Sequence, residues 1–326
     1  MADIRIKQLQ LWLAQQFTDV QLSAMNGDAG FRRYFRFTDN AQKFIAVDSP
    51  TDKCNNLAFV DIQKKLLARN IKVPELIAVD QAQGFFCLSD LGKNHLSDNI
   101  NAENMALRYQ QAIALLPDIA QLEPHGLPVY DRAFIEMELH IFVEWLIAKH
   151  LKISLTNAQY TSLQQNFELL ISNALEQPQV SMHRDFHSRN LMILDGGELA
   201  VIDFQDAVIG PITYDIVSLL RDCYQKWPYK NIAPLFDSFS QLITEQLCLP
   251  SYSQQQWLRW FDLMGLQRHI KASGIFARLY HRDGKGNYLS DIPLTLSYIV
   301  DVTKKYAELQ FLHQFIAETV LPAVVH

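Results

Sequence analysis

The chain has 326 residues, about half of them apolar and a fifth charged, and its formal net charge is −6. This length accommodates one large domain or two lobes, each with its own core. The negative charge argues against a generally basic surface for nucleic acid. No apolar run reaches the roughly 20 residues of a membrane-spanning helix, and the N-terminus lacks the apolar core of a signal peptide. We therefore expect a cytoplasmic protein with no nucleic-acid partner, no membrane association and no evident protein partner.

The N-terminal part of the chain predicts a small β-rich lobe, residues 1–91. Apolar spacing predicts helices near Lys7–Phe17 and Leu57–Arg69. Residues 26–30 form a turn-forming cluster. Alternating or short apolar runs predict the strands Phe31–Phe37, Phe44–Val47, Val73–Val79 and Phe85–Leu88.

The remainder, residues 92–326, predicts a larger and mostly helical lobe. Apolar residues recur at helical spacing in the segments Ala102–Leu122, Arg132–Leu151 and Ala158–Leu175, and again in most of the chain after Tyr214. Two short segments, Val180–Leu194 and Leu199–Ile202, are strand-like. The fold class is therefore α+β with two lobes, and a cleft between lobes is a common place for a ligand.

The strongest chemical signal is the loop His183–Asn190, which contains His183-x-Asp185 and ends in Asn190. A further aspartate, Asp203, ends the next strand-like run. Phosphoryl transfer needs a carboxylate that orients the attacking hydroxyl and takes its proton, and it needs oxygen ligands that hold Mg²⁺ on the phosphates. One aspartate and one asparagine on a loop, with a second aspartate after the next strand, can divide these tasks. The alternative interpretation is a polar loop between two strands.

The loop His183–Asn190, the run Ile202–Phe204 and Asp215 resemble the kinase-like fold of aminoglycoside phosphotransferases and choline kinases. A narrower resemblance is to the bacterial N-acetylmuramate/N-acetylglucosamine kinases, a family of anomeric sugar kinases in cell-wall recycling. The segments that carry it are residues 27–29, Phe31–Arg36, Asp203–Asp215 and Ala272–Lys285.

The resemblance implies a two-lobed protein-kinase-like fold with ATP and Mg²⁺ as cofactors. It also implies a small-molecule sugar substrate, phosphorylated at its anomeric hydroxyl to a sugar 1-phosphate. Two alternatives stay open. One is a kinase for an aminoglycoside, choline or another alcohol, and the other is a nucleotide-binding pseudokinase that serves as an interaction module.

Roles follow from the same resemblance. Asp185 would be the catalytic base, Asn190 and Asp203 would be Mg²⁺ ligands, and Asp215 would brace the catalytic loop. The segment Cys87–Gly92 would be the hinge, which meets adenine through the backbone of Ser89 and Leu91. Asp215 has an alternative role as an acidic residue at a helix N-terminus.

The phosphate-binding groups are less clearly marked. Gly27, Ala29 and Gly30 lie in a turn whose backbone N–H groups could approach phosphates, although the same turn could simply connect two strands. Kinases usually carry a lysine on the third strand, yet alternation along Phe44–Asp48 puts Asp48 at that place. Either the register differs, or the protein is a pseudokinase, or another cation serves, for which Arg32 and Arg36 are the candidates.

One predicted helix, from Trp257 to about His281, carries a cationic stripe. Its members are Arg268, Lys271, Arg278 and Arg282. An arginine here could receive an anionic group such as the lactyl carboxylate of N-acetylmuramate, or the stripe could be a solvated helix face. His187 is a further candidate for substrate contact, and Phe276 is expected in the core.

Overall fold

The computed structural model describes residues 3–25 and 30–325, and the chain divides into two compact units. Unit 1 comprises Met1–Asn99 and Arg189–Asp206, and unit 2 comprises Ile100–Ser188 and Ala207–His326. Unit 1 thus includes a second segment, which begins within the loop His183–Asn190. The boundary after residue 91 stays a prediction. No helix in the described residues is long and apolar enough to cross a membrane.

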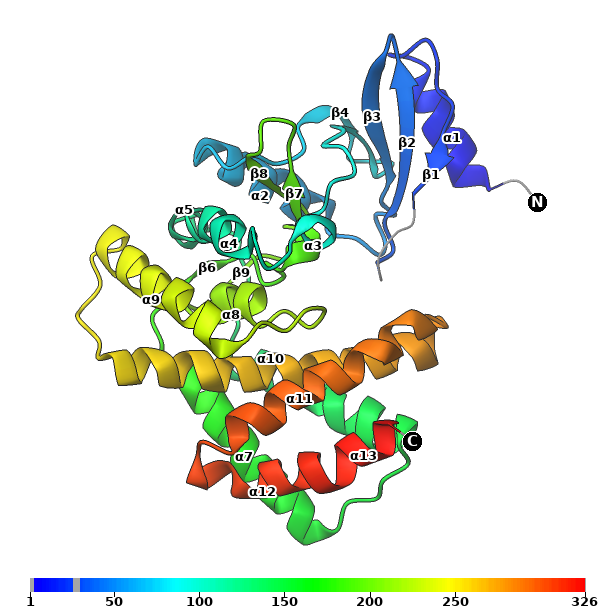
Figure 1. The fold of residues 1–326 in the computed structure, drawn as a ribbon. Coiled ribbons are helices and arrows are strands. Elements are labelled where there is room, and N and C mark those ends of the chain that lie inside the picture. Colours follow the sequence, from blue (N-terminus) through cyan, green and yellow to red (C-terminus); the bar gives the residue numbers. More distant parts are fainter. Residues whose placement is uncertain (1–2, 26–29, 326) are drawn as a thin grey trace. The chain divides into compact units, whose positions relative to one another are not determined.

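In the described part of unit 1, five strands form an antiparallel sheet in the order β1-β2-β3-β5-β4. They are β1 (Ser23–Ala24), β2 (Arg33–Asp39), β3 (Gln42–Asp48), β4 (Leu76–Asp80) and β5 (Phe85–Ser89). Figure 1 labels β1, β2, β3 and β4 of this sheet. A separate hairpin is formed by β7 (Leu191–Ile193) and β8 (Leu199–Val201). The helices are α1 (Ile4–Leu13), α2 (Asn56–Ala68) and α3 (Leu96–Asn99).

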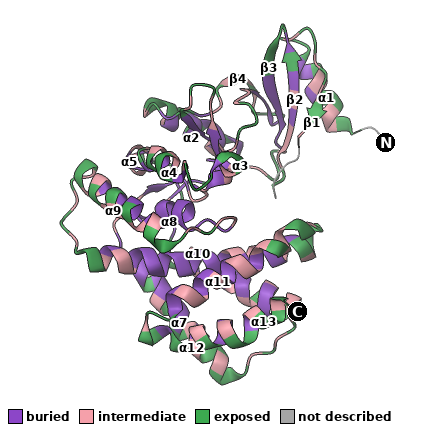
Figure 2. Ribbon diagram, in the orientation of Figure 1, coloured by how far each residue is buried: buried purple, intermediate pink, exposed green. Residues whose placement is uncertain are grey.

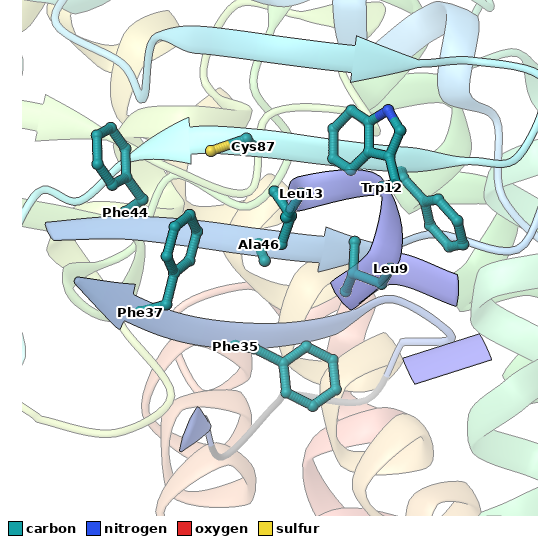
Figure 3. Packing of buried hydrophobic residues seen from close by; sticks show 9 residues of the cluster. Leu9, Trp12, Leu13, Phe35, Phe37, Phe44, Ala46 and Cys87 are labelled. Atoms are coloured by element: carbon teal, nitrogen blue, oxygen red, sulfur yellow. The ribbon is translucent and has the colours of Figure 1, made fainter. Parts of the chain in front are cut away.

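The register of the sheet shows which residues lie on each of its two faces. Residues paired across β2, β3 and β5 point to the same side, so Phe35, Ala46 and Cys87 share one face. This face packs against Leu9 and Leu13 of α1 (Figure 3). The opposite face carries Arg36, Ile45 and Leu88 in register.

Aromatic residues fill the core between α1 and the sheet. The rings of Phe37 and Phe44 (Figure 3) stack with centroids 5.3 Å apart. Phe17 contacts both rings, with centroid distances of 5.1 and 4.9 Å. Such rings bury a large apolar area in a small lobe. One face of the sheet is therefore covered by α1, and the opposite face is left to line a cavity.

Unit 2 is mostly helical. Its helices are α4 (Met105–Ile113), α5 (Leu116–Ala120), α6 (Arg132–Ile141), η1 (Phe142–His150), α7 (Asn157–Glu176), α8 (Tyr214–Leu220), α9 (Tyr229–Gln246), α10 (Gln254–Asp283), η3 (Gly286–Asp291), α11 (Ile292–Thr303), η4 (Ala307–Leu309), α12 (Gln310–Gln314), η5 (Phe315–Val320) and α13 (Leu321–Val325). A short ladder pairs β6 (Gln179–Met182) with β9 (Val208–Pro211), and η2 (Ser188–Asn190) begins where unit 2 passes into unit 1.

The small N-terminal sheet and the larger helical part confirm the predicted fold class. Two predicted helices differ in detail. Residues 102–122 form α4 and α5, and Pro117 stands in the first turn of α5, the place where a helix tolerates proline. Residues 132–151 form α6, which continues into the π-helix η1.

The helix α10 is the centre of unit 2. It is buried along its middle and exposed towards both ends (Figure 2). It packs on η1 so closely that a Cβ atom added at Gly274 would lie 2.6 Å from the backbone N and Cα of Phe142. Only glycine fits this contact, because side-chain carbons do not approach backbone atoms to such a distance.

We predict that Gly274→Ala lowers the thermal unfolding temperature. Overpacking typically costs about 1–3 kcal/mol, which outweighs the gain of up to ~1 kcal/mol in helix propensity. The control is Gly286→Ala, where the added Cβ would meet its nearest atom at 3.8 Å. Equal unfolding temperatures for Gly274→Ala and the wild type would show that α10 and η1 can move apart freely.

Candidate active site

The face of the sheet opposite α1 lines a cavity of about 220 Å³ in unit 1. Tyr34, Arg36, Ile45 and Leu88 contribute from the strands, and Phe59 contributes from α2. The remaining wall comes from Met25 and Pro74, from the end of β5 with the segment that follows it, and from the β7–β8 hairpin with its flanks. It consists of Met25, Pro74, Ser89, Asp90, Leu91, Gly92, His95, Asn190, Met192, Ile202, Asp203, Phe204 and Gln205.

The predicted hinge residues Ser89 and Leu91 both line this cavity. The backbone N–H of Ser89 donates to the carbonyl of Glu75 at 3.0 Å, and the hydroxyl of Ser89 accepts from the N–H of Glu75 at 2.8 Å. An adenine ring at this edge would therefore use backbone groups of residues 89–91 other than the N–H of Ser89.

The two candidate arginines, Arg32 and Arg36, differ in their position relative to the cavity. Arg36 lines the cavity, and its Nε and Nη2 donate to the carboxylate of Asp90 at 2.6 and 2.9 Å. Arg32 is absent from the lining. Its guanidinium donates to the hydroxyl of Ser49 at 3.1 Å and lies over the ring of Phe59 at 5.5 Å.

The inference that Asp48 occupies the place of the usual lysine was wrong about the face. Asp48 pairs in register with Arg33 and lies on the α1 side of the sheet, where it forms ion pairs with Arg5 and Arg33. On the cavity side, β3 presents Ile45. Its register partner Arg36 is thus a cation on the face that the lysine would occupy.

The two predicted metal ligands lie together on the cavity wall. The backbone N–H of Ile202 donates to the carbonyl of Asn190 at 3.0 Å, and Nδ2 of Asn190 donates to Oδ2 of Asp203 at 3.4 Å. Asp203 has a left-handed backbone with φ 61°, which is uncommon outside glycine and recurs at functional sites. Nearby, Gln205 donates to Asp203 at 2.8 Å, while its own Oε1 is buried without a hydrogen bond from the described residues.

These side chains fit a magnesium site. Carboxylate and amide oxygens are the hard ligands that Mg²⁺ prefers, and the buried amide oxygen of Gln205 adds another oxygen next to them. Of the predicted glycine turn, Gly27 and Ala29 lie outside the described residues, and Gly30 is exposed.

In unit 2, Asp215 at the start of α8 holds the loop that carries Asp185. The backbone N–H groups of His183 and Arg184 donate to its two carboxylate oxygens at 2.7 and 2.9 Å. Burial raises the pKa of Asp215 to about 7, against these two donors, which favour the charged form. Arg184 has a left-handed backbone with φ 76°. Asp215 thus braces a strained loop.

A buried carboxylate, Glu138 of α6, organises the charges around this loop. Its side chain is 1% exposed. Its Oε1 accepts from Arg184 at 2.7 Å and from Lys271 at 2.9 Å, and its Oε2 accepts from the hydroxyl of Tyr130 at 2.5 Å and from Gln267 at 3.1 Å. Each carboxylate oxygen of Glu138 therefore has two donors.

The same cations act on Asp185, which is partly buried in the loop after β6. Burial raises its pKa, but the positive charges of Lys271 and Arg184 outweigh burial and lower the pKa to about 2. Asp185 is thus an ionised carboxylate at neutral pH, held next to two cations that Glu138 keeps in place.

The predicted substrate residues differ from one another. Arg268 is 7% exposed, lies over the ring of Tyr214 at 5.4 Å, and has a buried Nη1 without a hydrogen-bond acceptor among the described residues. Arg278 is half-buried, and its Nε is likewise buried without an acceptor in the part of the chain that the structure describes. Arg282 is exposed and donates to Asp283 at 2.7 and 2.8 Å. His187 contacts the ring of Tyr224 at 5.5 Å.

Fold and loop together define a kinase-like phosphotransferase. A family model described as "Phosphotransferase enzyme family" matches residues 21–238, and the chain belongs to this family.

Relatives over nearly the full length include the N-acetylmuramate/N-acetylglucosamine kinases of Pseudomonas putida and Neisseria meningitidis serogroup B. The first is 38% identical over 97% of each chain. The second is 37% identical over 96% of this chain and 95% of the relative.

Among solved structures, a choline/ethanolamine kinase family protein from Mesorhizobium loti aligns with a TM-score of 0.64 at 10% identity, over 95% of this chain and 98% of the other. An ADP-bound aminoglycoside phosphotransferase aligns with a TM-score of 0.58 at 14% identity, over 95% and 98%. At these identities the likeness establishes the fold alone, which is the one predicted.

Glu138 was missed by sequence reasoning, although a signal was present. Along α6 and into the start of η1, the residues Ile135, Leu139 and Phe142 mark a buried stripe at helical spacing, and Glu138 belongs to that stripe. A carboxylate at a core position of a helix requires cationic or hydrogen-bonding partners.

We predict that Glu138→Gln destabilises the protein by roughly 3 kcal/mol at neutral pH, because the buried Lys271 and the partly buried Arg184 lose their counter-charge. Burial raises the pKa of Glu138, but Lys271 and Arg184 lower it from 4.5 to about 2. The lowered pKa stabilises the folded state above pH 4.5, and this contribution disappears as the pH falls towards 2. The difference in unfolding temperature between wild type and variant should therefore shrink over that range.

The matched control is Glu144→Gln, an exposed glutamate in the adjoining helix η1. It should change the unfolding temperature little at any pH. A Glu138→Gln difference that stays constant between pH 5 and pH 2.5 would contradict the ion-pair assignment.

Proposed function

We propose that this protein is an ATP-dependent kinase for N-acetylmuramate and/or N-acetylglucosamine. It transfers the γ-phosphoryl group to the anomeric hydroxyl and gives the sugar 1-phosphate. Support comes from the family membership and from relatives of that name, which match nearly the whole chain. The observation that carries the proposal in this chain is the ionised Asp185 in a loop that Asp215 braces.

Asp185 acts on the acceptor hydroxyl. A carboxylate with a pKa of about 2 is a weak base, so it orients the hydroxyl and accepts its proton as the bond to phosphorus forms. Lys271 and Arg184 keep this carboxylate charged, and they add positive charge near a reaction that moves negative charge. Both effects favour transfer to a neutral or anionic alcohol.

The cavity of unit 1 would hold ATP, with residues 89–91 next to adenine and with Asn190 and Asp203 next to the phosphates. Mg²⁺ bound there would neutralise the charge of the phosphates. The proposed phosphate contacts further include Arg36 on the cavity wall, together with Gly27, Ala29 and Gly30 of the predicted glycine turn. We place the enzyme in the cytoplasm, where ATP is available, and in the reuse of cell-wall amino sugars.

A substrate panel with a catalytic variant tests the proposal. Wild-type protein should phosphorylate one or both amino sugars with ATP and Mg²⁺, in preference to choline and an aminoglycoside. Asp185→Asn should still fold and bind nucleotide but lose about 10²–10⁴-fold in kcat. Near-normal turnover by the folded variant would remove Asp185 from its role, and turnover of choline alone would refute the amino-sugar assignment.

The choice between the two sugars depends on an arginine, and we propose Arg268. Only N-acetylmuramate carries a carboxylate, and Arg268 combines a buried Nη1 that has no acceptor among the described residues with an electrostatic effect on Asp185. Arg278 lies ten residues further along α10, about 15 Å by the helical rise, and Arg282 is already paired.

Arg268→Ala should reduce kcat/KM for N-acetylmuramate about ten- to a hundredfold relative to N-acetylglucosamine, because one charge-assisted hydrogen bond is lost. The ratio of the two kcat/KM values is the right measure, since it does not depend on the fraction of folded enzyme. Arg282→Ala, an exposed arginine of the same helix, should leave the ratio unchanged. Equal losses on both sugars would assign Arg268 a structural role.

A further inference from the structure

A row of aromatic rings begins beside the catalytic aspartate. The backbone N–H of His187 donates to the carbonyl of Asp185 at 3.0 Å, and the His187 ring is close enough to influence the Asp185 carboxylate electrostatically. The ring of His187 meets Tyr224 edge-on, with centroids 5.5 Å apart. The acceptor hydroxyl must lie at Asp185, so the start of this row borders the acceptor.

The row continues through three more segments of unit 2. Tyr224 lies 6.3 Å from Phe276 of α10, and Phe276 stacks on Tyr288 of η3 at 5.8 Å with an angle of 14° between the rings. Phe276 is 5% exposed, whereas Tyr224 and Tyr288 are partly exposed. The buried ring therefore backs two rings that a ligand can reach.

Buried polar contacts fix the beginning of the row. The carboxylate of Asp222, which is 1% exposed, accepts from the backbone N–H of Tyr224 at 3.0 Å and from the backbone N–H of Ser188 at 3.1 Å. The hydroxyl of Ser188 donates to the same carboxylate. Because Ser188 follows His187 in the catalytic loop, Asp222 ties the position of Tyr224 to that of the loop.

The charges nearby restrict what can lie on these rings. A row of rings next to a catalytic site suits either a cation or a ligand with C–H faces. Lys271 and Arg268 both act on Asp185 through their positive charge, and they would repel a quaternary ammonium or a polyamine. An N-acetylated pyranose is neutral or anionic, and its ring presents C–H groups on its faces and hydroxyls at its edges.

We propose that Tyr224, backed by Phe276 and continued by Tyr288, is the surface on which the pyranose ring of the acceptor sugar stacks. His187 stands at the reacting end of this surface. Its Nδ1 is buried without a hydrogen-bond partner in the described part of the chain, and it is placed to bond a hydroxyl of the sugar. This inference rests on the proposed function and adds the residues that recognise the sugar ring.

The experiment compares steady-state kinetics of three variants on N-acetylglucosamine and ATP. Tyr224→Leu removes the ring and should raise the KM for the sugar about tenfold or more, with less than a twofold change in the KM for ATP. Tyr224→Phe keeps the ring and should behave as the wild type. The matched control is Tyr252→Leu, a tyrosine of similar exposure that packs on Trp257 and Trp260. Trp260 lies about 24 Å from Phe276 along α10.

An unchanged KM for the sugar in Tyr224→Leu would overturn the proposal, and so would a loss in Tyr224→Phe equal to that in Tyr224→Leu. If Tyr224→Leu does not fold, Tyr288→Leu tests the outer end of the row. An unchanged KM for the sugar in that variant would also overturn the proposal. If the wild type phosphorylates the sugar and Tyr224→Leu has an unchanged KM for it, this inference is refuted and the proposed function is not. Wild-type turnover of choline instead of either sugar refutes the proposed function together with it.

Discussion

The loop of unit 2 that carries Asp185 depends on one buried carboxylate, Glu138. A charge without water needs partners on all sides, and Glu138 finds them in Arg184 of that loop and in Lys271 and Gln267 of α10. Its negative charge allows two cations to stay buried close to Asp185. Without it, the same cations would have Asp185 as their main counter-charge, and the carboxylate would be engaged as a structural partner and not available to the acceptor.

Sequence reasoning could propose candidate site residues that lie close together in the chain. Asp185 and Asn190 are five residues apart and Asp203 follows one hairpin later, and the roles proposed for them rest on this spacing and on the family resemblance. Glu138 lies far from them in the sequence, and only the packing of α6 on α10 brings it to Lys271. The aromatic row likewise joins separate segments, which contribute Tyr224, Phe276 and Tyr288. For Phe276, helical periodicity indicates at most a position in the core, and this was the expectation.

Sequence reasoning also could not show which face of the strand β3 is covered by another element. Alternation along β3 correctly separates Ala46 and Asp48 from Ile45, but the pattern does not say which face α1 covers. The face that α1 covers is set by the packing of Leu9 and Leu13 against Phe35 and Ala46 (Figure 3). Once α1 occupies that face, Asp48 belongs to the ion pairs with Arg5 and Arg33, and Arg36 becomes the cation of the opposite face.

The close contact at Gly274 has a consequence for how this enzyme can diversify. The helix α10 carries Arg268, Lys271 and Phe276, and it is fixed against η1 at a position that accepts no side chain. Any drift of the helix axis moves all three side chains together, so changes of acceptor through α10 are coupled to loss of stability. Tyr224 and Tyr288 lie outside this helix, on the segment after α8 and in the short helix η3. Natural variation and laboratory evolution of acceptor choice should therefore accumulate at those two positions first, while α10 retains its sequence.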